Sequence, residues 1–303
     1  MKDQKIIPHL WFDNEVVEAA HFYTSLFPNS KIISSNVIED TPSGDASFVE
    51  FQLMDFKFMG INGGPYFKMN PSISFIVNFN PAKDSDAVKN IDRLWASLLQ
   101  GGKTLMPLQK YDFADYYGWL EDRYGVSWQF MLNEPSKDPN WGIVPSLMFV
   151  GEVAGKAEEA TDFYMSVFKN SKRDGIYYYP EGMEFDKPNS VMFSAFSLEN
   201  MCFAANDSGM DHDFMFNEGV SLLIYCNNQE EIDYYWDKLS HVPESEQCGW
   251  LKDKYGVSWQ VHPKILDELM RNGSKEQKDR VTKAFLKMKK FNIQELLDAY
   301  NNK

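Results

Sequence analysis

The 303-residue chain has few of the residues that build covalent or metal-bound frameworks. It contains three cysteines and five histidines. Cys202, Cys226 and Cys248 form no C-x-x-C pair. An odd number of cysteines without such a pair argues against a disulfide framework and against a thiolate zinc site. We therefore expect a protein of the reducing cytoplasm.

Basic residues and long apolar runs are also scarce. Lys and Arg number 30 against 44 Asp and Glu, which gives a formal net charge of −14 at pH 7. Binding to phosphates needs a basic face, so this balance argues against nucleic acid and anionic membranes as partners. No apolar stretch reaches the length of about 18 residues that a membrane span needs, and the first 13 residues lack the apolar core of a signal peptide. We expect a protein that is neither exported nor membrane-spanning.

Aromatic residues, in contrast, are abundant at 15% of the chain. The hydrophobic share of 44% and the charged share of 24% are ordinary for a globular protein. A chain of this length suffices for two domains, each able to bury a core without disulfide bonds or metals.

The strongest feature of the sequence is an internal repeat. Residues 119–129 and 250–260 both read Trp-Leu-x-Asp-x-Tyr-Gly-Val-Ser-Trp-Gln and differ at only two positions. Upstream, both copies contain Pro-x-Leu-x-Phe, then Glu-Ala-x-x-Phe-Tyr, then Asn-Ser-Lys, in the same order. A long-period repeat is stronger evidence for the domain organisation than any local sequence pattern. It predicts a tandem duplication with domains at 1–133 and 145–263, a linker at 134–144 and a tail at 264–303.

Each copy contains two rounds of one pattern, a strand, a helix and three more strands. In copy one, hydrophobic periodicity predicts strands at 6–12, 31–39, 46–54, 56–61, 73–79 and 126–132, and helices at 15–27 and 85–99. Capping-box spacing at Ser274 with Gln277 and at Asn292 with Glu295 predicts helices in the tail, packed on the second domain. The fold class is thus α+β, with two tandem domains of paired βαβββ units.

These motifs resemble the PhnB-like family, many of whose members are labelled 3-demethylubiquinone-9 3-methyltransferase-like. The family belongs to the glyoxalase/bleomycin-resistance/dioxygenase superfamily, also called vicinal oxygen chelate. The resemblance covers both copies, up to about Pro263. It implies that paired βαβββ units form a cupped mixed sheet around a small-molecule cavity.

The resemblance also implies where a metal would bind. Superfamily enzymes commonly hold a divalent metal with one side chain from the first and last strand of each unit. Those positions fall at or near His9, Met59, Ser72, Gln129, Ser146, Ala204, Gly219 and Gln260. Almost no carboxylate or imidazole is among them, and neutral amides bind a divalent ion weakly. We expect no metal and no other cofactor; the alternative is a divalent metal held in the first domain by His9 and Gln129.

Strand alternation selects the side chains that face the cups. In 126–132 the apolar residues share one face and leave Gln129 on the other, and 257–262 likewise leaves Gln260 and His262. On the first strands, His9 and Trp11, and Ser146 in copy two, face the cavity. The predicted ligand-binding residues are therefore His9, Trp11, Gln129, Ser146, Gln260 and His262, with His9 also the candidate catalytic acid or base. The alternative is that these polar groups only satisfy one another or the backbone.

Three functions stay open. The first is a protein that binds a small molecule in a cup without a catalytic metal, and we favour it. The second is an enzyme: a metal-dependent lyase, isomerase or dioxygenase, or the methyltransferase of the family label, although a Gly-rich strand-to-helix turn for S-adenosylmethionine is lacking. The third is an interaction protein that binds a partner through its C-terminal helices. The assembly state is open, a homodimer included.

Overall fold

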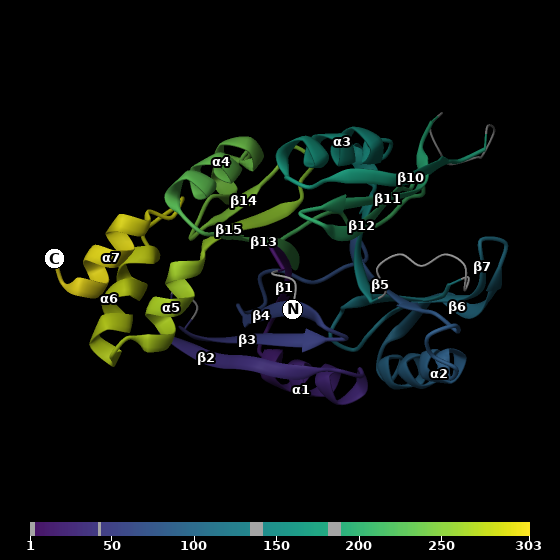
Figure 1. Cartoon of the computed structure of the whole chain (residues 1–303), viewed down its shortest axis with the longest axis horizontal. Coiled ribbons are helices and arrows are strands. Elements are labelled where there is room, and N and C mark those ends of the chain that lie inside the picture. Colours follow the sequence, from purple (N-terminus) through teal and green to yellow (C-terminus); the bar gives the residue numbers. More distant parts are fainter. Residues whose placement is uncertain (1–3, 42–43, 134–141, 181–188) are drawn as a thin grey trace.

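The computed structural model describes residues 4–41, 44–133, 142–180 and 189–303 (Figure 1). Most of the predicted linker, residues 134–141, lies outside the described residues. The described residues form two mixed sheets that are flanked by helices. None of the helices in the described ranges is both long and apolar enough to cross a membrane.

Sheet A has seven strands and sheet B has eight. In spatial order, sheet A contains β14 (Trp250–Lys252), β15 (Ser258–Pro263), β13 (Val220–Cys226), β1 (Ile6–Phe12), β4 (Phe56–Asn62), β3 (Gly44–Leu53) and β2 (Lys31–Thr41). Sheet B contains β10 (Lys172–Tyr178), β11 (Val191–Leu198), β12 (Met201–Asp207), β9 (Ile143–Phe149), β5 (Ile73–Phe79), β8 (Ser127–Leu132), β7 (Ala114–Glu121) and β6 (Lys103–Tyr111).

Each sheet joins one unit of each copy. The first strands β1 and β13 pair antiparallel in the centre of sheet A, and β5 and β9 do the same in sheet B. The α+β class, the cupped sheets of paired βαβββ units and the tandem copies are confirmed. The arrangement differs in two respects. The second unit of copy two has only two described strands after its helix, β14 and β15, and the two units of one copy do not share a cup. The backbone groups at the free edge of a first strand can pair equally well with the equivalent strand of either copy. The hydrophobic periodicity of the sequence therefore does not predict which strand becomes the partner.

Four helices cover the faces of the sheets opposite to the cups: α1 (Val16–Leu26), α2 (Ala87–Leu98), α3 (Ala157–Val167) and α4 (Gln229–Leu239) (Figure 1). Two 3-10 helices, Gly151–Val153 and Pro243–Ser245, lie in connections. The predicted apolar stripe of α2 is buried through Ile91, Leu94 and Leu98. Leu10 and Phe12 of β1 join the same continuous core, as alternation predicts.

A buried carboxylate explains the motif at residues 119–129. Asp122 Oδ2 accepts hydrogen bonds from the Tyr23 hydroxyl at 2.7 Å and from Trp128 Nε1 at 2.9 Å. Its Oδ1 accepts from the backbone N–H of Tyr124 and of Val126. Four donors occupy the lone pairs of a carboxylate, so this side chain is fully satisfied.

Copy two repeats this network. Asp253 Oδ2 accepts from the Tyr164 hydroxyl at 2.7 Å and from Trp259 Nε1 at 2.8 Å, and Oδ1 accepts from two backbone N–H groups. In each copy the tyrosine lies on the helix of the first unit and the tryptophan on the last strand of the second unit. The repeated motif therefore holds together two units whose strands belong to different sheets.

The C-terminal tail forms three helices, α5 (Lys264–Asn272), α6 (Lys275–Phe285) and α7 (Ile293–Asn301). The predicted capping box of Ser274 with Gln277 is present, and Asn292 caps α7. Figure 1 shows the tail at the end of the molecule opposite to sheet B. The carbonyls of Met288 and Lys289 accept hydrogen bonds from residues 248 and 249, next to β14. The tail thus packs on the second domain, as predicted.

Candidate functional site

The concave faces of the two sheets are the candidate sites. On sheet A, His9 lies opposite Met59 of β4 and Ser221 of β13, and Gln260 of β15 donates to the Ser221 hydroxyl at 3.0 Å. We call this face the His9 cup. On sheet B the equivalent positions hold Ser146, Ala204, Ser74 and Gln129. We call this face the Ser146 cup.

The predicted ligand-binding residues divide between the cups in an unexpected way. His9 was expected to share a cup with Gln129, and Ser146 with Gln260. The structure instead brings His9 together with Gln260, and Ser146 together with Gln129. The cause is the exchange of units between copies. The residues opposite the first strands are Ser74 and Ser221, each two positions after the expected Ser72 and Gly219, which is a difference of register along β5 and β13.

The polar groups at the floor of the Ser146 cup satisfy one another. Gln129 Nε2 donates to Ser74 Oγ at 2.7 Å, and Gln129 Oε1 accepts from the Tyr117 hydroxyl at 2.7 Å. Trp119 Nε1 donates to Ser127 Oγ. This is the arrangement that the alternative interpretation of the glutamines predicts. Both Nε2 and Oε1 of Gln129 thus have a hydrogen-bond partner.

His9 behaves differently. Its Nδ1 is buried, and no group in the part of the chain that the structure describes forms a hydrogen bond with it. Burial, with a smaller contribution from the charge of His262, lowers the pKa of His9 to about 3, so the ring is neutral at physiological pH. A buried polar atom without a partner is rare in folded proteins and calls for an explanation.

Aromatic rings surround His9 on one side. Trp250 contacts the His9 ring edge to face, with centroids 5.5 Å apart, and Trp11 contacts Trp250 at 5.9 Å and Phe67 at 5.0 Å. The Trp11 ring lies against the backbone of Gly63, where any Cβ would meet ring atoms at 2.2 Å. Trp11 therefore depends on glycine at this turn for its position.

A second polar cluster lies on the other side of the His9 cup. Asp267 of α5 accepts hydrogen bonds from the Tyr225 hydroxyl at 2.7 Å and pairs with His262 Nε2 at 2.8 Å. Burial alone would raise the pKa of Asp267, but the neighbouring His262 brings it below its usual value. Burial also raises the pKa of Tyr225, so its phenol keeps its proton.

Tyr225 and Asp267 were missed in the sequence. Alternation in 220–226 places Tyr225 on the same face as Ser221, so the pattern contained the signal. No pattern places Asp267, because its contact depends on how the tail folds back. Two ion pairs also lie beside the cup, Lys57 with Glu50 at 3.2 Å and Lys252 with Glu218 at 2.8 Å.

The donor atoms of neither cup suit a divalent metal ion. At the first- and last-strand positions, the His9 cup offers an imidazole, a thioether, a hydroxyl and an amide, and the Ser146 cup offers two hydroxyls and an amide. Such ions prefer three or more His, Asp or Glu ligands, and the described part of the chain contains no group of this kind. His9 and Gln129, the pair named for a metal, lie in different cups. The prediction that no metal cofactor is used stays a prediction.

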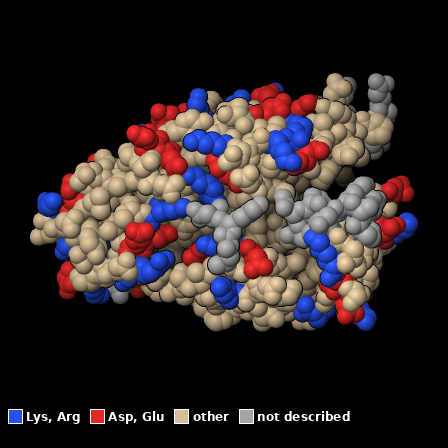
Figure 2. Space-filling view, in the orientation of Figure 1, with Lys and Arg blue, Asp and Glu red and all other residues tan. Residues whose placement is uncertain are grey.

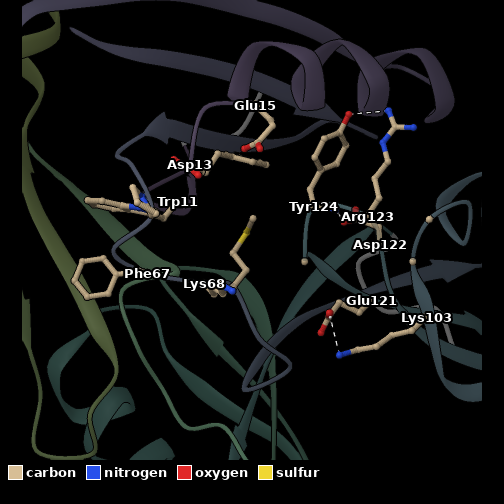
Figure 3. A pocket seen from close by; sticks show the side chains of 16 residues that line it. Trp11, Asp13, Glu15, Phe67, Lys68, Lys103, Glu121, Asp122, Arg123 and Tyr124 are labelled. Atoms are coloured by element: carbon tan, nitrogen blue, oxygen red, sulfur yellow. Dashed lines mark hydrogen bonds and ion pairs between the residues drawn. The ribbon is translucent and has the colours of Figure 1, made fainter. Parts of the chain in front are cut away.

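A groove of about 460 Å³ lies between the start of α1 and the turn after β7 (Figure 3). Trp11 and Phe67 form its end wall. Lys103 and Glu121 form an ion pair at 3.1 Å, and Arg123 binds the Tyr124 hydroxyl. Of the predicted ligand-binding residues, Trp11 alone lines this groove, and no buried polar side-chain atom in its wall lacks a partner.

The face seen in Figure 2 gives no indication of a nucleic-acid-binding surface. Acidic and basic side chains are interspersed there and form no continuous basic face. The expectation that nucleic acid is not a partner therefore still depends on the net charge.

Two proteins of known structure are similar in sequence to part of the chain. A PhnB protein from Bacillus cereus, described as a 3-demethylubiquinone-9 3-methyltransferase, is 35% identical; the match covers 43% of this chain and 100% of that chain, with a TM-score of 0.39. A protein from Staphylococcus aureus is 30% identical over 44% of this chain and 98% of that chain, with a TM-score of 0.18.

Glyoxalase I from Zea mays matches over a longer stretch. It is 12% identical over 77% of this chain and 80% of that chain, with a TM-score of 0.50, so it shows the fold alone. A search of curated proteins gives no match. The family model described as 3-demethylubiquinone-9 3-methyltransferase matches residues 4–131 and 141–262. The chain thus belongs to that PhnB-like family, as two tandem copies with a glyoxalase/bleomycin-resistance fold.

Proposed function

We propose that this protein binds a small, planar, uncharged molecule in the His9 cup without a metal. The observation that carries the proposal is the buried Nδ1 of His9, which has no hydrogen-bond partner among the described residues. Leaving such a group unsatisfied costs about 1–3 kcal/mol. A ligand that supplies the missing hydrogen bond accounts for its presence.

The difference between the cups supports this choice. The equivalent of His9 in the other cup is Ser146, and the neighbouring Gln129 is already satisfied by Ser74 and Tyr117. Gln129 of the Ser146 cup thus needs no ligand to complete its hydrogen bonds. The two cups, each built from one unit of each copy, thus differ in what they offer to a ligand.

The surroundings of His9 favour an uncharged ligand. The ring is neutral, and the nearby Lys57 and Lys252 are each paired with a glutamate. A ligand charge would be buried without a partner, which is costly. The rings of Trp11 and Trp250 offer surfaces for a planar molecule. Phenols and neutral nitrogen heterocycles have the required shape and hydrogen-bonding groups.

Replacing His9 with phenylalanine is expected to weaken ligand binding at least tenfold, because the hydrogen-bonding nitrogen is lost. The same change should leave stability at neutral pH equal or higher, since an unsatisfied polar atom is removed. Ligand-observed NMR with indole, phenol and imidazole, compared with benzoate and benzylamine, measures the first effect. Thermal unfolding measures the second.

Gln129→Ala serves as the matched control in the other cup, and it should leave probe binding unchanged. Elemental analysis of the purified protein is expected to give no stoichiometric transition metal. Failure of all uncharged probes to bind, or equal binding by His9→Phe, contradicts the proposal. Stoichiometric metal that is lost in the His9 variant would favour the alternative of a metal-dependent lyase, isomerase or dioxygenase.

A further inference from the structure

The floor of the His9 cup is closed from solvent. Ile7 is 0% exposed, Leu223 is 1% exposed and His9 is 1% exposed, although all three lie on the concave side of sheet A. With Tyr225 and Met59 the two apolar residues form a small cluster that is separate from the main core. A molecule therefore reaches His9 only when some segment over the cup moves.

Helix α5 is attached to the cup by a polar contact. Two hydrogen bonds tie Asp267 to the strands, one from Tyr225 of β13 and one with His262 of β15. Arg271, one turn further along the same side of α5, interacts electrostatically with Tyr225 and Asp267. The apolar side chains Leu266 and Leu269 instead belong to the main core.

This arrangement is unusual for a helix that is fixed over an apolar surface. Such a helix normally turns an apolar stripe toward the surface it covers. Helix α5 instead presents Asp267 to the apolar patch that contains Leu223. The helix is bounded by Pro263, the last residue of β15, and by Gly273, and both have extended backbone angles.

The rest of the tail has separate contacts with the second domain. The backbone N–H groups of Cys248 and Gly249 donate to the carbonyls of Met288 and Lys289 at 2.8 and 2.7 Å. Gln229 of α4 bonds to the backbone at Phe291 and Ile293. Residues 286–293 are thus anchored to the second domain, whereas α5 lies between them and the cup.

We propose that α5 is the cover of the His9 cup, and that the contact of Asp267 with Tyr225 and His262 is the latch that keeps it closed. Release of the latch lets α5 move away from the cup and opens the way to His9. The identity of the molecule that enters the His9 cup rests on the proposed function. It assigns to the tail a role at the site, rather than only a packing role or the binding of a separate partner.

A thiol introduced at the cup floor tests the latch without any ligand. In the full-length His9→Cys protein, alkylation of residue 9 by N-ethylmaleimide is followed by peptide mass spectrometry, which separates it from the three native cysteines. Alkylation is expected to be slow, and at least tenfold faster when Asp267→Ala is added. Tyr225→Phe should give a smaller increase, because it removes one of the two hydrogen bonds.

Glu268→Ala is the matched control, because Glu268 is an exposed acid on the same helix and its loss should leave the rate unchanged. Leu223→Cys provides a second reporter on the neighbouring strand if the first variant does not fold. Equal alkylation rates with and without Asp267→Ala overturn the proposal, as does rapid alkylation in the parent. Failure of indole to bind the wild-type chain would count against the proposed function, while the alkylation rates would still decide on the latch.

Discussion

Replacing Asp122 or Asp253 with alanine is expected to lower the free energy of unfolding by about 4 kcal/mol. Each carboxylate accepts four hydrogen bonds, from a tyrosine, a tryptophan and two backbone N–H groups. Alanine leaves all four donors buried without a partner, and each such group costs about 1–3 kcal/mol before the structure relaxes. Because the network links two units of one copy, we expect loss of cooperativity as well.

Urea denaturation followed by circular dichroism measures this effect. Tyr23→Phe is the graded comparison, since it removes one donor and should cost about 1 kcal/mol. Asp115→Ala is the control for charge: its side chain is 75% exposed in an ion pair with Lys110, and its loss should leave stability nearly unchanged. If Asp122→Ala lowers the free energy of unfolding no more than Asp115→Ala does, the network is not a main support of the fold.

His9 should make the protein sensitive to mild acid. Burial lowers the pKa of His9 to about 3 in the folded chain, against about 6.5 for an unfolded histidine. Between these values the unfolded state binds a proton that the folded state does not, so stability falls as pH decreases from about 6.5 toward about 3. At pH 5 this linkage costs about 2 kcal/mol.

The measurement compares unfolding free energies at pH 7.5 and pH 5 in wild type and His9→Phe. The variant should lose about 2 kcal/mol less stability over this interval, because it lacks the titrating ring. His21→Gln, which replaces an exposed histidine of α1, should keep the wild-type dependence. An identical acid response in wild type and His9→Phe would mean that His9 is solvated or protonated in the native state, and would remove the support for an unpartnered Nδ1.

Local patterns were sufficient for most of the elements. The strands at 6–12 and 73–79 were predicted at their observed bounds, and the helices to within two residues at each end. Alternation also assigned His9, Gln129 and Gln260 to the concave faces correctly. These features depend on backbone hydrogen bonds and side-chain periods within a few residues, which the sequence displays directly.

The sequence by itself determined the duplication, the βαβββ units and the family, because these depend on residue order. Only the tertiary structure decided which units share a cup, since β1 finds its partner β13 more than two hundred residues away. That pairing places His9 beside Gln260 rather than Gln129 and leaves its Nδ1 without a partner. Burial and cross-strand contacts depend on the whole chain, and for the same reason Asp267 entered the site only when the tail folded over the cup.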